Sequence, residues 1–242
     1  MYNILKKELS EFLNSLIAYA VITVFLTGIG LLMWVFPDTS ILEYGYADME
    51  TLFGLGPYVM MFLIPAITMR TFAEEFKNGT IELLFTRPVT DWQIILGKYF
   101  AGLIIVIISI APTLIYYFSV GALGNPVNNL DTPGIIGSYM GLILLGAIFT
   151  SVGMLSSSIT RNQIVSFIFS VFICFILYSG FRSLAGINVW GDWSVFLDQL
   201  GIIYHYNSLS RGLIDTRNIV YFISVISLML FTTKLILGSR KW

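Results

Sequence analysis

Six long segments of the sequence carry no charged residue, and they constrain the fold more than any motif does. A bilayer hydrocarbon core is about 30 Å thick, which roughly 20 helical residues cross. Within that core every backbone polar group must be bonded internally, so only helices and closed barrels can span it. The segments are continuously apolar and lack the alternation of barrel strands, so they predict an all-α polytopic membrane protein. They are residues 12–37, 51–69, 99–130, 132–160, 162–181 and 218–233.

The composition excludes a soluble globular domain. Hydrophobic residues make up 57% of the chain and charged residues 11%, whereas soluble proteins average about 25% charged residues. The net charge of −1 says nothing about a partner, and we expect no nucleic acid among the partners. The single cysteine, Cys174, excludes a disulfide within the chain, and in the middle of a span it behaves as a small hydrophobic residue.

We expect one transmembrane domain over residues 1–242, with an amphipathic N-terminal helix at 1–15. Ile4, Leu9 and Phe12 fall on one helical face of that segment, and Lys6 and Ser10 fall on the other. This pattern favours a helix lying in the membrane interface over a plain extension of the first span. No small-residue cleavage site follows, so we do not expect a signal peptide. The predicted transmembrane helices are 16–36, 57–70, 99–121, 138–157, 163–181 and 218–238.

The distribution of basic residues predicts the orientation. An even number of spans places both termini on one side of the membrane. On that side ten Lys and Arg residues fall, against three on the other, namely Arg182, Arg211 and Arg217. By the positive-inside rule, both termini and the loop 71–98 face the cytoplasm.

The loop 71–98 contains the densest run of charge in the chain. Phe72 and Phe76 begin a helical spacing that Gly79 interrupts, and a glycine costs about 1 kcal/mol inside a helix. Thr90 and Gln93 form a capping-box pattern that predicts the start of the next helix. We therefore expect short helices in a compact cytoplasmic unit.

The outer loop 182–217 offers a weaker signal. Trp193, Phe196, Leu197, Leu200 and Tyr204 share one helical face, which predicts a short amphipathic or re-entrant helix. It either gates a substrate exit or anchors the neighbouring spans, and the sequence leaves both open.

Three further patterns concern packing and contacts. Gly137 and Gly141 permit close helix packing, which we assign to internal packing first and to a subunit interface second. His205 is the only histidine, so we expect a hydrogen-bonded residue and no metal site. The serines at 156–158, together with Arg161, Asn162 and Gln163, mark a short inner loop, which is either a second contact with a partner or a plain turn.

Two groups of residues carry a resemblance to a known family. The first group is Glu75-x-x-x-Gly79-Thr80-x-Glu82-x-Leu84, Arg87-Pro88-Val89 and Gly97-Lys98-Tyr99, and the second is the stretch Tyr204–Asp215, which contains Arg211, Gly212 and Asp215. With these motifs the chain resembles the permeases of ABC-2 type transporters. More narrowly, the chain resembles the permeases of the gliding-motility ABC transporters of gliding bacteria. The resemblance implies a multi-pass subunit of the bacterial cytoplasmic (inner) membrane.

The resemblance also implies a division of labour. In such permeases the N-terminal helix and the first cytoplasmic loop dock on a separate ABC ATPase. The residues of this coupling loop are Glu74, Glu75, Gly79, Thr80, Glu82, Arg87 and Pro88. Any one of the three carboxylates alone is equally compatible with a solvated face. As a group we expect them to meet a basic groove, because the resemblance places them there. The family further implies a second permease chain, identical or related, paired through the first and fifth spans. Membrane lipid surrounds the assembly.

The residues agree with this reading in two respects. The chain contains no G-x-x-x-x-G-K-[ST] motif, so we expect ATP to be used by the partner, with no catalytic residue or cofactor here. The spans carry no ionisable group away from their ends, which disfavours an ion-coupled carrier and an intramembrane enzyme. The remaining alternative is a non-transporting anchor or assembly subunit that couples an ATPase to an envelope machine.

Overall fold

The predicted fold class is confirmed by a computed structural model, which describes residues 1–81, 89–187, 191, 193–213 and 215–239. The described residues form helices and no strand, and six helical stretches are long and apolar enough to cross a membrane. The helices are α1 (Tyr2–Leu13), α2 (Leu16–Trp34), α3 (Ile41–Tyr44), α4 (Glu50–Thr68), α5 (Ala73–Asn78), α7 (Asp91–Ile110), α8 (Leu114–Leu123), α9 (Thr132–Ile159), α10 (Gln163–Phe175), α11 (Phe181–Ala185), α12 (Trp193–Leu200), α13 (Ile202–Ser210) and α14 (Thr216–Ser239).

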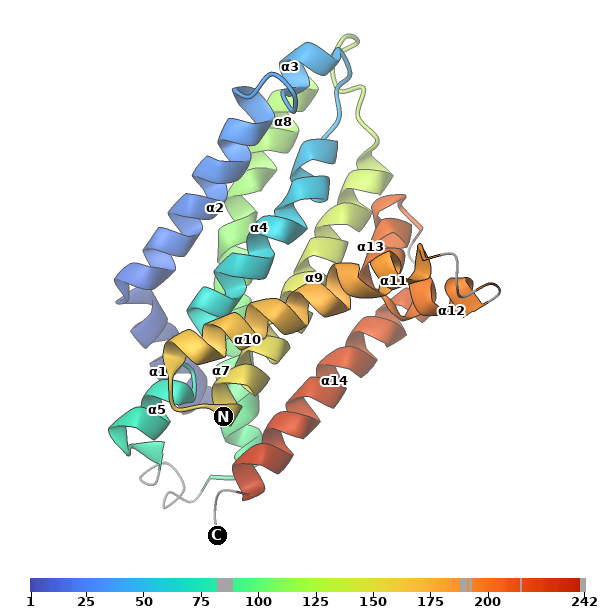
Figure 1. Cartoon of the computed structure of the whole chain (residues 1–242). Coiled ribbons are helices and arrows are strands. Elements are labelled where there is room, and N and C mark those ends of the chain that lie inside the picture. The colour runs from blue at the N-terminus through green and yellow to red at the C-terminus, as the bar shows by residue number, and fades with distance from the viewer. Residues whose placement is uncertain (82–88, 188–190, 192, 214, 240–242) are drawn as a thin grey trace.

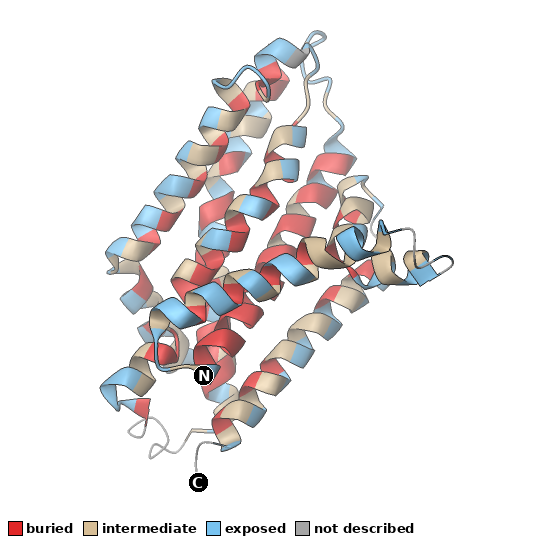
Figure 2. Cartoon of the chain, in the orientation of Figure 1, coloured by how far each residue is buried: buried red, intermediate tan, exposed pale blue. Residues whose placement is uncertain are grey.

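The bundle is organised around α9, which packs against α4, α7, α10, α13 and α14 (Figure 1). Buried residues follow almost the whole length of α9, while α2 and α14 expose long apolar faces (Figure 2). Such faces suit contact with lipid, because hydrocarbon is as apolar as the side chains themselves. The N-terminus, α1, α5 and the C-terminal end of α14 lie at the same end of the bundle (Figure 1).

Small residues on α9 allow its close packing. A Cβ atom at Gly137 would lie 2.2 Å from the carbonyl oxygen of Leu209, and one at Gly141 would lie 3.1 Å from the ring of Tyr206. Both neighbours belong to α13. The predicted assignment of these two glycines to internal packing is therefore confirmed.

Side-chain caps decide where several helices begin. The Ser15 hydroxyl accepts a hydrogen bond from the Ile17 amide and separates α1 from α2. Thr90 and Gln93 form the predicted capping box at the start of α7, which confirms that motif. Asp131 and Asn162 cap α9 and α10 by single side-chain bonds, which they accept from the amides of Gly134 and Ile164. A side-chain cap allows a helix to begin among the polar residues that precede the apolar stretch. Several helices therefore extend beyond the ends of the predicted spans.

The serines at 156–158 do not belong to a loop, contrary to the short inner loop that both readings of the sequence assumed. All three lie inside α9 and are fully buried, and the connection to α10 is the short stretch 160–162. Their hydroxyls bond to backbone carbonyls, which allows polar side chains to sit inside a buried helix.

The segment after α10 differs from the predicted single amphipathic helix. It forms α11, α12 and α13, with a break at Gly201, where a Cβ atom would lie 3.2 Å from Phe181 Cβ. Three residues of the predicted face on α12 remain exposed, namely Trp193 at 69%, Phe196 at 53% and Leu200 at 38%, and Leu197 is half-buried. The anchoring residues are instead Ile202, Tyr206 and Leu209 of α13, which are buried against the bundle.

Candidate functional site

The polar end of the bundle, where α1, α5 and α7 meet, is the candidate functional site. Helix α1 packs along α7, and a Cβ atom at Gly97 would lie 2.9 Å from the Ile4 side chain. Further along, Phe12 is buried in one cluster with Ala101 and Ile105 of α7. The apolar face of α1 is therefore covered largely by the protein itself.

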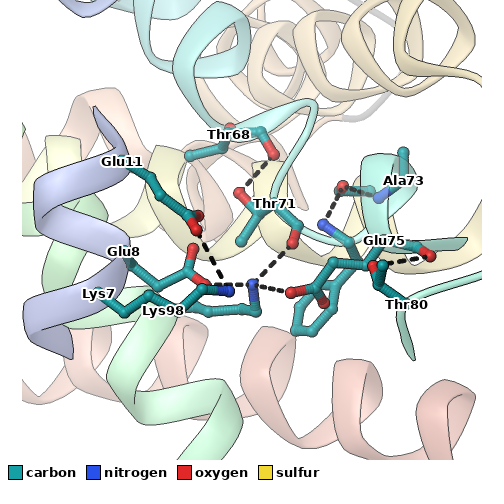
Figure 3. Close-up of polar contacts among 11 residues, drawn as sticks. Lys7, Glu8, Glu11, Thr68, Thr71, Ala73, Glu75, Thr80 and Lys98 are labelled. Carbon is teal, nitrogen blue, oxygen red and sulfur yellow. Dashed lines mark hydrogen bonds and ion pairs between the residues drawn. The ribbon is translucent and has the colours of Figure 1, made fainter. Parts of the chain in front are cut away.

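A buried ion cluster fastens α1 and α5 to α7 (Figure 3). The Lys98 ammonium lies 2.7 Å from Oε1 of Glu8 on α1 and 2.9 Å from Oε1 of Glu75 on α5. It donates a third hydrogen bond, of 3.0 Å, to the carbonyl oxygen of Thr71. The three donors of the ammonium are thereby used, and the Lys98 side chain is only 1% exposed. Nζ also lies 5.4 Å from the centre of the Phe72 ring.

The cluster holds two carboxylates and one ammonium, so its charges do not balance. Burial raises the pKa of the Glu8 carboxyl above its ordinary value, and the ammonium of Lys98 offsets only part of that effect. The other oxygen of Glu75, Oε2, is buried without a hydrogen-bond partner among the described residues. Such an oxygen is an acceptor available to a donor from outside the described part of the chain.

Helix α5 presents the predicted coupling loop. It ends at Gly79, whose φ of 69° is the left-handed conformation of a helix C-cap, so the predicted break there is confirmed. Glu74 is half-buried and Thr80 is exposed, while Glu75 turns inward to Lys98. The predicted site residues Glu82, Arg87 and Pro88, and a second short helix after Gly79, lie outside the described residues.

A groove of about 890 Å³ runs between α1 and α5. Its walls carry charges of both signs, from Lys7 and Glu11 on α1 and from Glu74 on α5. Arg70 crosses one end, where its guanidinium donates to the Ser15 hydroxyl. The groove can therefore receive a polar segment of another chain. It is lined by Asn3, Ile4, Lys7, Glu8, Ser10, Glu11, Phe12, Asn14, Ser15, Arg70, Thr71, Glu74, Glu75, Asn78, Thr80, Val89 and Lys98.

The outer-loop residues Arg211, Gly212 and Asp215 lie at a separate place, between α13 and α14. Gly212 has a φ of 74° and packs against the backbone of Pro133. Asp215 accepts a hydrogen bond of 2.9 Å from the amide of Arg217 and so caps the start of α14. These contacts explain the motif as turn geometry, because they bring no second polar cluster to it.

His205 is hydrogen-bonded, as the sequence predicts. Its Nδ1 lies 2.8 Å from Oδ1 of Asn218 and its Nε2 lies 2.9 Å from the carbonyl oxygen of Gln199. The ring stacks on Tyr221 with a centroid distance of 3.9 Å. These bonds fasten α12 and α13 to the first turn of α14.

Sequence reasoning missed Glu8 and Lys98 as site residues. Lys98 entered the argument only as part of the motif Gly97-Lys98-Tyr99, and Glu8 was not among the predicted site residues. A signal was present for Glu8, which lies between Ile4 and Phe12 at four-residue intervals and so belongs to the apolar face. A carboxylate on a face that becomes buried requires a cation nearby.

Comparison with known proteins shows the family to which the chain belongs. A family model described as ABC-2 family transporter protein matches residues 2–237. The chain belongs to the ABC-2 transporter family. It is thus a multi-pass membrane permease subunit of an ABC transporter, which works with an ABC ATPase. No curated protein matches the chain.

Proposed function

We propose that the groove between α1 and α5 is the surface on which this ABC-2 permease receives its ATPase, on the cytoplasmic side of a bacterial cytoplasmic membrane. The observation that carries the proposal is the buried Lys98 cluster, because it fixes α1 and α5 to the same point of α7. A displacement of α1 or of α5 is thereby transmitted to the membrane-spanning helix α7. Glu74, which lines the groove, and the exposed C-terminal end of α5 supply polar groups for a partner surface.

The ten-to-three distribution of Lys and Arg supports the orientation of the proposal. Two such permease chains, identical or related, pair through the first and fifth spans by family resemblance. The exposed apolar faces of α2 and α10 are compatible with that arrangement. The resemblance to gliding-motility permeases supports a role in gliding or in export to the cell envelope.

Purification of the tagged chain from its native membrane tests the proposal. We expect an ABC ATPase to co-purify in stoichiometric amount, together with a second permease chain, and deletion of the gene to abolish colony spreading. Absence of an ATPase from the wild-type complex would overturn the docking proposal. An active complex with a single permease chain would overturn the dimer. ATP hydrolysis by the complex that no envelope component stimulates, together with loss of gliding in the deletion strain, would favour the non-transporting anchor subunit over a permease that transports.

A further inference from the structure

The start of α5 is held by a side chain from another helix. No side chain of α5 or of the turn before it caps its first turn, where Phe72 occupies the N-cap position. The Ser157 hydroxyl of α9 instead accepts hydrogen bonds of 2.9 Å from the amides of both Phe72 and Ala73. The same hydroxyl donates a bond of 2.9 Å to the carbonyl oxygen of Met69.

This arrangement uses the full bonding capacity of one hydroxyl. A serine side chain has one donor and two acceptor positions, and Ser157 commits all three to the turn between α4 and α5. The residue is fully buried, so water cannot replace these bonds. Its neighbours differ, because the hydroxyls of Ser156 and Ser158 bond to Val152 and Leu155 within α9 itself.

The bonded turn lies against the most central helix of the bundle. The Phe72 ring is fully buried in one cluster with Met154 of α9, and the Lys98 ammonium lies over it. The turn is thus bonded to α9 through Ser157 and to α7 through Lys98. Since α9 contacts α4, α7, α10, α13 and α14, a displacement of its end reaches most of the bundle.

We propose that Ser157 is a positioning residue that makes α5 and the adjoining end of α9 move as one body, so that ATPase-driven displacement of α5 is transmitted to α9. This inference rests on the proposed function in one respect only, the source of the displacement. The bond itself is a property of the permease alone.

Hydrogen exchange on the permease in lipid nanodiscs tests the bond. In Ser157→Ala we expect exchange in residues 70–78 to accelerate on the order of tenfold, because two amides lose their buried acceptor. Ser156→Ala is the matched control and leaves that segment at the wild-type rate. Ser157→Thr, which retains the hydroxyl, returns the rate toward wild type. Equal rates in Ser157→Ala and Ser156→Ala would overturn the proposal.

The same measurement on the complex with its ATPase tests transmission. Addition of ATP and vanadate should change exchange at both 70–78 and 150–160 in the wild type and in Ser156→Ala. In Ser157→Ala the ATPase remains bound at wild-type stoichiometry, the change at 70–78 persists and the change at 150–160 is lost. A retained change at 150–160 would overturn transmission through Ser157. Failure of the wild type to bind an ATPase would instead overturn the docking proposal, and the two failures are thereby distinguished.

Discussion

The Tyr206 hydroxyl donates a hydrogen bond of 2.7 Å to the carbonyl oxygen of Phe53. Pro57 stands four residues after Phe53 in α4 and has no amide hydrogen, so the helix cannot satisfy this carbonyl itself. Tyr206 of α13 supplies the missing donor and at the same time joins the outer segment to α4. This bond satisfies the carbonyl that Pro57 leaves free, so α4 continues through Pro57; it begins at Glu50, whereas the predicted span began at residue 57.

We expect Tyr206→Phe to lower stability by about 1–2 kcal/mol, because it leaves a buried carbonyl oxygen without a donor. Tyr204→Phe is the matched control on the same helix, since that ring is 41% exposed and should change stability little. Thermal unfolding of the purified proteins measures the difference. Equal midpoints for the two variants would show that the bond to Phe53 contributes nothing measurable.

Lys98→Met removes the only cation of the buried cluster and leaves two carboxylates facing each other. Breaking one side of a buried ion pair costs about 3–5 kcal/mol, so we expect a large loss of thermal stability and release of α1 from α7. Lys7→Met is the control, because the Lys7–Glu11 pair is exposed, and such pairs contribute at most about 1 kcal/mol.

Limited proteolysis near the N-terminus reads the release of α1 directly. Addition of Glu8→Gln and Glu75→Gln to Lys98→Met should recover part of the stability, because it removes the uncompensated charges. A Lys98→Met variant as stable as Lys7→Met would contradict the assigned role of the cluster.

Features set by neighbouring residues were predictable from the sequence. The capping box of Thr90 and Gln93 and the cap at Gly79 each depend on a few consecutive residues. The close packing at Gly137 and Gly141 was also foreseeable, because two small residues on one helical face admit a neighbour whatever its identity. The number of spans followed from the apolar segments alone.

Contacts between distant residues were not predictable in the same way. Lys98 and Glu8 are 90 positions apart, Phe72 and Ser157 are 85 apart, and Tyr206 and Phe53 are 153 apart. Each pairing depends on which helix faces overlap in the bundle, and an amphipathic pattern gives the face but not the neighbour. The same limit explains Glu75, whose charge suggested a partner in water although its nearest cation is internal.

Cysteine labelling tests the orientation. In a Cys174→Ala background we expect Asn78→Cys and Asn129→Cys to react with an impermeant reagent from opposite sides of the membrane, with Asn78 on the cytoplasmic side. Both side chains are exposed, and Asn129 is preferred to Asn128, whose φ is 64°. Labelling of both positions from outside intact cells would exclude the six-span topology.

The last prediction concerns the carboxylates of α5. Charge reversal of Glu75 is expected to weaken ATPase binding, but it also replaces the carboxylate whose Oε1 lies 2.9 Å from the Lys98 ammonium by a second cation, and so disturbs the permease itself. Glu74 separates the two effects, because it lines the groove and belongs to no ion pair with Lys98. Its reversal should leave thermal stability close to wild type.

We therefore expect Glu74→Lys to lower ATPase affinity at least about tenfold, since loss of a desolvated charge contact costs about 2–5 kcal/mol. Glu43→Lys is the control, an exposed carboxylate on α3, at the end of the bundle away from α5 (Figure 1). Binding is measured by titrating the purified ATPase onto each permease variant in nanodiscs. Wild-type affinity in Glu74→Lys, together with lost binding and lost stability in Glu75→Lys, would assign the effect of Glu75 to its bond with Lys98. The docking surface would then lie elsewhere than on the carboxylates of α5.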